Sequence, residues 1–181
     1  MKTKTKTMLK ITNILSWIIF IGLCIQTGAF LFSYFVSMFI NIAATKDIYL
    51  GLNISELYHN SILYYNILLF MIILISGLKA YLFYFIIKIF LKLNFTDPFS
   101  NEIYALIIRI SYVALAIGII AIATKKWCDW LVNQGIQLPV LNLEQYIGGR
   151  SEFIFMAAVI FIIAQLFKRG IEIQSENELT I

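Results

Sequence analysis

Apolar residues gather along this chain in four long stretches, separated by more polar segments. Residues 11–45 contain no charged side chain, and the only charged side chains in residues 60–93 are three lysines. A helix needs about 20 apolar residues to cross a hydrocarbon core of about 30 Å. The pattern therefore predicts an all-α integral membrane bundle of four transmembrane helices, forming one domain over residues 1–181. The four spans are expected at about residues 14–42, 62–83, 103–123 and 150–168.

Composition supports this class of protein. Hydrophobic residues make up 61% of the chain and charged residues 13%. The charged share is about half of the roughly 25% that is usual in soluble domains. An ordinary soluble fold is therefore excluded.

The fourth stretch is the shortest of the four. Residues 153–167 would form a helix of only about 22 Å, so the flanking Lys168 and Arg169 must snorkel and the bilayer must thin locally. We still predict that this stretch crosses the membrane. It then separates an outer loop, residues 124–149, from a cytoplasmic tail, residues 169–181.

A stop and a restart are expected between the second and third spans. Residues 84–96 should extend the second helix along the cytoplasmic surface. A new helix should then begin at Asp97 and Pro98. Asp97 can accept hydrogen bonds from free backbone N–H groups, and Pro98 suits the first helical position because it has no N–H.

Positive charges predict the direction of insertion, because cytoplasmic segments carry an excess of Lys and Arg. With both termini cytoplasmic, eight basic residues lie inside and four outside. The eight are Lys2, Lys4, Lys6, Lys10, Lys88, Lys92, Lys168 and Arg169, and the four are Lys46, Lys125, Lys126 and Arg150. Trp127 and Trp130 then mark the outer interface as an aromatic belt.

Few residues could carry catalysis. His59 is the only histidine, and Cys24 and Cys128 form no CxxC motif. The four apolar stretches contain no acidic residue, so a metal site or a pair of catalytic aspartates cannot be built inside them. We expect no catalytic residue, no metal site and no cofactor, and an enzyme is the class that the sequence favours least.

Three polar side chains within the expected spans are candidate site residues, namely Gln26, Lys79 and Arg109. Lys79 and Arg109, both expected in the cytoplasmic half, either snorkel to the inner headgroups or face the bundle and bind an acidic group such as Glu102 or the tail. Gln26 and its neighbour Thr27 either form interhelical hydrogen bonds or contribute to a substrate site. We favour the structural alternative in each case.

The last residues of the chain combine acidic and apolar side chains. Glu172, Glu176 and Glu178 precede the apolar residues Leu179 and Ile181. A solvated, frayed terminus would explain the acidic part. An apolar end with a free carboxylate would instead suit capture by a groove or a backbone nest. Both alternatives remain open.

Two short motifs resemble a known family. They are the turn Asp97-Pro98-Phe99-Ser100, and a tail that begins at Gly170 and reads IQSENELTI over residues 173–181. They resemble a bacterial family of four-span inner-membrane proteins that carries only a domain-of-unknown-function label. This chain departs from the pattern of that family at Ile173, Ser175 and Glu178, where the family has Leu, Glu and Asp.

The resemblance implies a multi-pass protein of the bacterial inner, or cytoplasmic, membrane. Members of the family look like partners of small helix-turn-helix regulators, which implies a membrane sensor or a protein that sequesters a transcription factor. The acidic tail would attract a basic DNA-binding regulator, whereas direct nucleic-acid binding by this chain is not expected. The candidate partner-binding residues are Asp97, Pro98, Phe99, Glu172, Glu176, Glu178, Leu179, Thr180 and Ile181.

Two other classes stay open. A small transporter or channel subunit would carry a flux that depends on Lys79, Arg109 or Gln26. A purely structural subunit would co-purify with another membrane protein. A homo-oligomer is compatible with either class and with the regulatory one.

Overall fold

The computed structural model describes residues 2–93 and 99–178, and within them every regular element is a helix. The predicted all-α class is therefore confirmed. The elements in chain order are α1 (Lys2–Phe39), the 3₁₀ helix η1 (Ile42–Lys46), α2 (Ser55–Asn60), α3 (Ile62–Lys92), α4 (Asn101–Asn133), α5 (Val140–Ile147) and α6 (Arg150–Glu178).

Four segments are long and apolar enough to cross a membrane, as the sequence predicted. Three of them lie in the single helices α1, α3 and α4, and the fourth, Val140–Glu176, includes both α5 and α6. These segments indicate a multi-pass membrane protein. Insertion into the bacterial inner membrane and the side on which the termini lie stay predictions.

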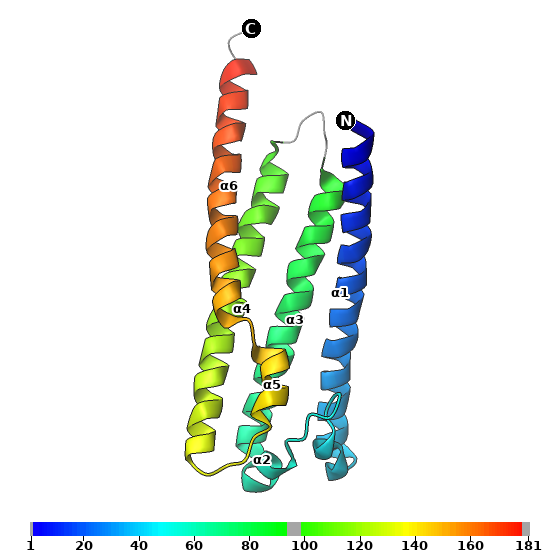
Figure 1. Ribbon diagram of the computed structural model, residues 1–181, viewed down its shortest axis with the longest axis vertical. Coiled ribbons are helices and arrows are strands. Elements are labelled where there is room, and N and C mark those ends of the chain that lie inside the picture. Colours follow the sequence, from blue (N-terminus) through cyan, green and yellow to red (C-terminus); the bar gives the residue numbers. More distant parts are fainter. Residues whose placement is uncertain (1, 94–98, 179–181) are drawn as a thin grey trace.

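The four long helices stand side by side in a row, in the order α1, α3, α4, α6 (Figure 1). α3 packs extensively against α1 and α4, and α4 packs extensively against α6, whereas α1 and α6 do not. α1 begins and α6 ends at the same end of the molecule, which we name the terminal end. We name the opposite end, which holds η1, α2 and residues 134–139, the loop end.

Side-chain contacts fix the relative heights of the helices. Phe20 of α1 contacts Tyr84 of α3, with ring centroids 6.4 Å apart. Tyr64 of α3 meets the edge of Trp127 of α4 at 6.0 Å. The Ser111 hydroxyl of α4 donates to the carbonyl oxygen of Ala157 of α6 at 2.9 Å. Each neighbouring pair in the row is therefore antiparallel and held in a defined register.

The predicted start of the third long helix is wrong. α4 begins at Asn101, and the N-cap is Ser100, whose side chain accepts from the backbone N–H of Ile103 at 3.3 Å. A serine hydroxyl at the N-cap satisfies a backbone donor that has no partner within the helix. Asp97 and Pro98, the predicted start, lie outside the described residues. α3 continues as a helix to Lys92, and the position of residues 84–96 along the cytoplasmic surface stays a prediction.

The predicted outer loop, residues 124–149, is mostly helical. α4 continues to Asn133, and α5 follows after Pro139. Thr124, Cys128 and Leu131 of this part of α4 are buried, while Lys125 and Asp129 pair on the outside at 2.7 Å. The charged residues from position 125 onward thus mark where α4 becomes amphipathic, not where it ends. α4 continues for nearly three turns beyond the predicted end of the span at residue 123. The predicted tail is likewise helical as far as Glu178.

Candidate functional site

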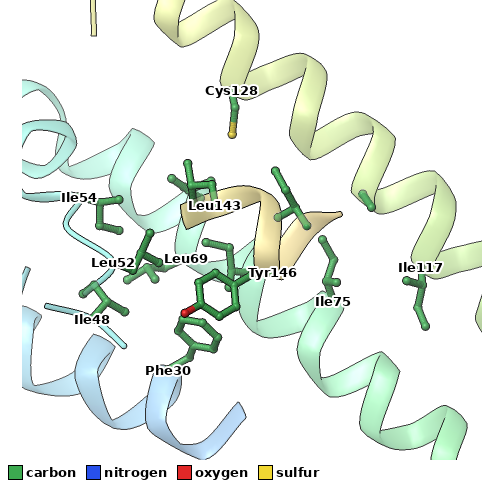
Figure 2. Close-up of a cluster of buried hydrophobic side chains, with 14 of the residues drawn as sticks. Phe30, Ile48, Leu52, Ile54, Leu69, Ile75, Ile117, Cys128, Leu143 and Tyr146 are labelled. Atoms are coloured by element: carbon green, nitrogen blue, oxygen red, sulfur yellow. The ribbon is translucent and has the colours of Figure 1, made fainter. Parts of the chain in front are cut away.

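The candidate site lies where the fourth apolar segment is interrupted, between α5 and α6. α5 is not a surface loop segment, because it packs beside α3 and α4. Leu143, Tyr146 and Ile147 of α5 are almost completely buried. Figure 2 shows Leu143 and Tyr146 within the apolar cluster that α1, α3, α4 and the segment after η1 build together.

Polar contacts also hold α5 in place. The Asn142 side chain donates to the carbonyl oxygen of Gly51 at 3.2 Å, and the Tyr146 hydroxyl donates to that of Tyr49 at 3.3 Å. The Tyr146 ring meets the Phe30 ring of α1 edge to face, with centroids 5.0 Å apart. α5 therefore connects the α1 side of the row to the α4 and α6 side, although α1 and α6 do not pack together.

Two glycines interrupt the helix. Gly149 has a φ of +79°, which residues with a Cβ adopt at a cost. A Cβ on Gly148 would collide with the carbonyl oxygen of Glu144 in the last turn of α5. Glycine is therefore required at both positions, and α6 starts directly after them at Arg150.

The break lies at the middle height of the row. A Cβ on Gly118, near the midpoint of α4, would lie 3.1 Å from the carbonyl oxygen of Arg150 and 2.6 Å from Ile154. α6 therefore begins beside the centre of α4. α5 occupies the loop-end half of the fourth apolar segment and α6 the terminal-end half, so this segment is a discontinuous helix.

An ion pair bridges the break. The Arg150 guanidinium donates to both carboxylate oxygens of Glu144, at 2.8 and 2.7 Å. This two-point geometry is the strongest that an arginine and a carboxylate form. The exposed fractions of the two side chains are 26% for Arg150 and 41% for Glu144. The pair therefore joins the end of α5 to the start of α6 while remaining accessible from one side.

Lys79 of α3 is the third charged group at the break. Its Nζ donates to the carbonyl oxygen of Tyr146 at 2.9 Å and lies 5.6 Å from the centre of the Phe153 ring of α6. The last carbonyls of a helix have no partner within it and carry partial negative charge, which suits a lysine. Among the described residues, no carboxylate lies within 4.0 Å of Lys79.

The predicted role of Lys79 is therefore wrong. The ammonium group reaches the last turn of α5, near the middle height of the row, and does not extend to the terminal end. Its expected acidic partner Glu102 instead pairs with Lys92 at 3.0 Å. Arg109 is exposed and makes no ion pair in the part of the chain that the structure describes, so no functional pair with Lys79 is formed. Its snorkelling stays a prediction.

The predicted interhelical hydrogen bonds of α1 are also wrong for Thr27. Its hydroxyl donates to the Leu23 carbonyl oxygen of its own helix at 2.8 Å. Gln26 is half-buried. The alternative that Gln26 and Thr27 contribute to a substrate site stays a prediction.

The candidate partner-binding residues are only partly described. The Phe99 ring packs on the Phe167 ring of α6 at 5.1 Å and lies close to Gly170. Glu172 pairs with Arg169 one turn earlier in α6 at 2.9 Å. The start of α4 and the end of α6 therefore meet at the terminal end. Residues 97, 98 and 179–181, and the Glu178 side chain, lie outside what the structure describes.

Glu144, Arg150 and Tyr146 were missed as site residues because all three were assigned to the outer loop or its edge. The apolar segment Val140–Glu176 is longer than the predicted fourth stretch, residues 153–167, and it includes Glu144. The apolar residues Val140, Leu143 and Ile147, with helical spacing before a Gly-Gly pair, were the available signal. A helix, a break and a second helix could have been predicted from it.

The chemistry that these groups allow is electrostatic. Within residues 2–93 and 99–178, no group of three His, Cys, Asp or Glu side chains is placed to hold a metal ion. Two cations and one carboxylate at a helix break can bind an anion, exchange partners when an anion arrives, or pass a conformational change along α6.

The fold and the site indicate a class, a multi-pass helical membrane protein whose fourth apolar segment is a discontinuous helix. The family described as a protein of unknown function, DUF2975, matches residues 38–181. The chain belongs to this family, which confirms the predicted membership of an uncharacterised family. No curated protein and no solved structure matches the chain.

Proposed function

We propose that this protein is a non-enzymatic sensor of the bacterial inner membrane that binds a small basic helix-turn-helix regulator at its cytoplasmic face. One observation carries the proposal. α6 is a single helix that begins at the charged break, with Arg150, and continues to Glu178 at the terminal end. A change at the break can therefore move the surface that a cytoplasmic partner would contact.

The break supports an input role. Ionisable side chains within apolar membrane segments are costly and usually serve a function. Lys79, Glu144 and Arg150 are three such groups, and they join α3, α5 and α6. The glycines at 148 and 149 supply a point where α5 and α6 can change their relative angle.

The end of α6 supports an output role. Beyond the contact of Gly170 with Phe99, α6 continues for two more turns and carries Glu172 and Glu176. Glu178 and the apolar residues at 179 and 181 follow in the sequence. A basic regulator would be attracted to the carboxylates and anchored by the apolar residues.

The test is binding of a purified small basic helix-turn-helix regulator to the full chain in nanodiscs. Removing residues 176–181, or replacing Glu172 and Glu176 by Gln, should weaken binding at least about tenfold through the loss of charge attraction. Glu152→Gln, the same chemical change at the other end of α6, is the matched control and should leave binding unchanged. Equal binding by the truncated and complete chains would disprove the output surface.

A small transporter or channel subunit is the second candidate. It is favoured by the discontinuous helix, because transporters commonly place their substrate sites at such breaks near the middle of the membrane. Proteoliposomes with an internal chloride-sensitive dye would report an anion flux. An anion flux that disappears in Lys79→Met or Arg150→Gln would establish the transporter or channel function. If the flux does not exceed that of empty liposomes, this candidate is excluded and the sensor function remains.

A further inference from the structure

The segment between η1 and α2 turns back beside α1 toward the middle of the row, instead of crossing the loop end directly (Figure 1). Two backbone hydrogen bonds close the segment. The N–H of Ile54 donates to the carbonyl oxygen of Thr45 at 3.0 Å, and the N–H of Ile48 donates to that of Leu52 at 2.9 Å. We name residues 45–54 the returning turn, and Leu50 lies at its tip.

Contacts near the tip show how far the returning turn reaches. The Tyr49 ring lies 5.3 Å from the Phe30 ring of α1, measured between centroids. The carbonyl oxygen of Tyr49 accepts from the Tyr146 hydroxyl of α5 at 3.3 Å. Phe30 is about 13 Å along the helix from Phe39, the last residue of α1. The tip therefore lies beside a part of α1 that is expected to be within the membrane.

The expected outer interface gives a second measure of this depth. Trp127 belongs to the predicted aromatic belt, and its ring meets the Tyr64 ring of α3. The hydroxyl of the next residue, Tyr65, is 2.6 Å from that of Ser37 in α1. Ser37 is about 10 Å nearer to the loop end than Phe30 is. The tip thus lies on the membrane side of the aromatic belt.

Leu50 combines a disfavoured backbone conformation with an exposed side chain. Its φ is +48°, and the φ of Gly51 is +80°. A turn with two such residues usually has Asn, Asp or Gly at the first of them, because a Cβ is disfavoured there. The Leu50 side chain is 77% exposed, so the chain itself packs little on it. In water the leucine would gain nothing in return for the strain, whereas lipid would surround it with apolar groups.

The polar backbone groups at the tip have partners within the protein. The N–H of Gly51 donates to the Asp47 carboxylate at 2.9 Å, and its carbonyl oxygen accepts from the Asn142 side chain of α5 at 3.2 Å. Irregular backbone at membrane depth needs such partners, because lipid supplies none. Leu141, the residue before Asn142, is 86% exposed. The two elements that this hydrogen bond joins therefore each present an exposed leucine.

We propose that the tip of the returning turn inserts into the lipid leaflet at the loop end, with Leu50 in contact with acyl chains. Lys46 and Asp47, at the start of the turn, are exposed and stay among the headgroups. The turn is thus a lipid-binding anchor that lies between α1 and α5. Lipid that packs on Leu50 would act on α5 through the hydrogen bonds of Asn142 and Tyr146.

Single cysteines test whether the tip is shielded from water. They are introduced in a chain with Cys24→Ala and Cys128→Ala, which removes both native thiols. Leu50→Cys reports the tip. Glu56→Cys is the matched control on the same connection between α1 and α3. Both native side chains are exposed, so neither cysteine disturbs the packing of the core.

The control position faces water. Glu56 lines an open depression together with the polar side chains of Asn53 and Gln137. In nanodiscs, a charged maleimide should label Leu50→Cys at least about tenfold more slowly than Glu56→Cys, because apolar surroundings disfavour the reactive thiolate. Both variants should label equally fast once they are denatured. Equal rates in the nanodiscs would overturn the proposal.

Brominated lipids distinguish a lipid cover from a protein cover. A membrane-permeant bimane is attached to each cysteine, and the protein is placed in nanodiscs of phosphatidylcholine with bromine on its acyl chains. Bimane at position 50 should lose more fluorescence than bimane at position 56, relative to nanodiscs without bromine. A tip that is shielded but not quenched would show that protein, such as a second copy of this chain, covers Leu50, and would overturn the lipid contact. These measurements use the purified protein without a regulator, so their outcome is independent of the proposed function.

Discussion

The Nζ of Lys79 lies 2.9 Å from the carbonyl oxygen of Tyr146, and this hydrogen bond joins the middle of α3 to the last turn of α5. Tyr146 is in turn 5.0 Å from Phe30, measured between ring centroids. A single buried residue of α5 thus connects α3 with α1. One charged group in an apolar segment thus helps to hold α5 in place, together with the hydrogen bonds from Asn142 and from the Tyr146 hydroxyl.

Replacing Lys79 by methionine should release the end of α5. Methionine keeps most of the volume but cannot donate, so the Tyr146 carbonyl loses its partner. Hydrogen bonds that involve a charged group contribute about 1.5 to 3 kcal/mol, and we expect the free energy of unfolding in detergent to fall by this amount. Arg109→Met is the matched control, since Arg109 is exposed, and should change it by less than about 0.5 kcal/mol. Equal effects of the two substitutions would contradict the role of Lys79.

The Glu144 and Arg150 side chains should be coupled energetically. Arg150→Gln removes both hydrogen bonds to Glu144, at 2.8 and 2.7 Å. Because the Glu144 side chain is 41% exposed, solvent screens the charge that remains, and we expect a loss of only about 1 kcal/mol. A double-mutant cycle with Glu144→Gln should give a coupling energy of similar size. Additive single effects would show that the pair does not hold the break together.

Gly118 should tolerate no side chain. A Cβ there would lie 2.6 Å from the Ile154 side chain and 3.1 Å from the Arg150 backbone oxygen, so α6 must move away. Gly118→Ala should therefore lower the free energy of unfolding by about 1 to 3 kcal/mol, although alanine favours helix formation. Gly22→Ala on α1 is the matched control, because nothing lies within 4 Å of its Cβ. Gly22→Ala should leave the free energy of unfolding unchanged or raise it slightly. Thermal unfolding of both variants in the same detergent measures the difference.

The long helices could be predicted from sequence because an apolar segment in lipid must satisfy its backbone hydrogen bonds internally, which a helix does. α3 begins at Ile62, where the second span was predicted to begin, but it ends at Lys92, before the predicted end of its extension at residue 96. The exact start of α4 did not follow. Asp97 and Ser100 are both residue types that cap helices, and only the structure identifies Ser100 as the N-cap.

The depth at which α5 lies could not be predicted from the sequence, for a different reason. α5 is short, and its helical pattern includes the charged Glu144, so the segment is typical of a surface loop. Its depth is set by contacts with residues far away in the chain, such as Gly51 and Tyr49. The direction of the Lys79 side chain depends on that depth. Local pattern could therefore predict that Lys79 was embedded but not what it binds.

Removing the Ser37 hydroxyl and removing the Tyr65 hydroxyl should lower the free energy of unfolding by different amounts, although the two groups share one hydrogen bond. Their side-chain oxygens lie 2.6 Å apart, and both residues are buried. The Ser37 hydroxyl donates to the carbonyl oxygen of Tyr34 at 2.9 Å, so in the shared bond the Tyr65 hydroxyl is the donor. Tyr65→Phe leaves Ser37 with its bond to Tyr34 and should cost about 0.5 to 1 kcal/mol.

Ser37→Ala should cost more, about 1 to 3 kcal/mol, because it leaves the buried Tyr65 hydroxyl without a partner. The double variant should then be no less stable than Ser37→Ala alone, since removing the stranded hydroxyl removes its desolvation cost. Thermal unfolding of the three variants in one detergent measures this order. If Tyr65→Phe were the more damaging single change, the direction of the hydrogen bond would be the reverse of the one assigned.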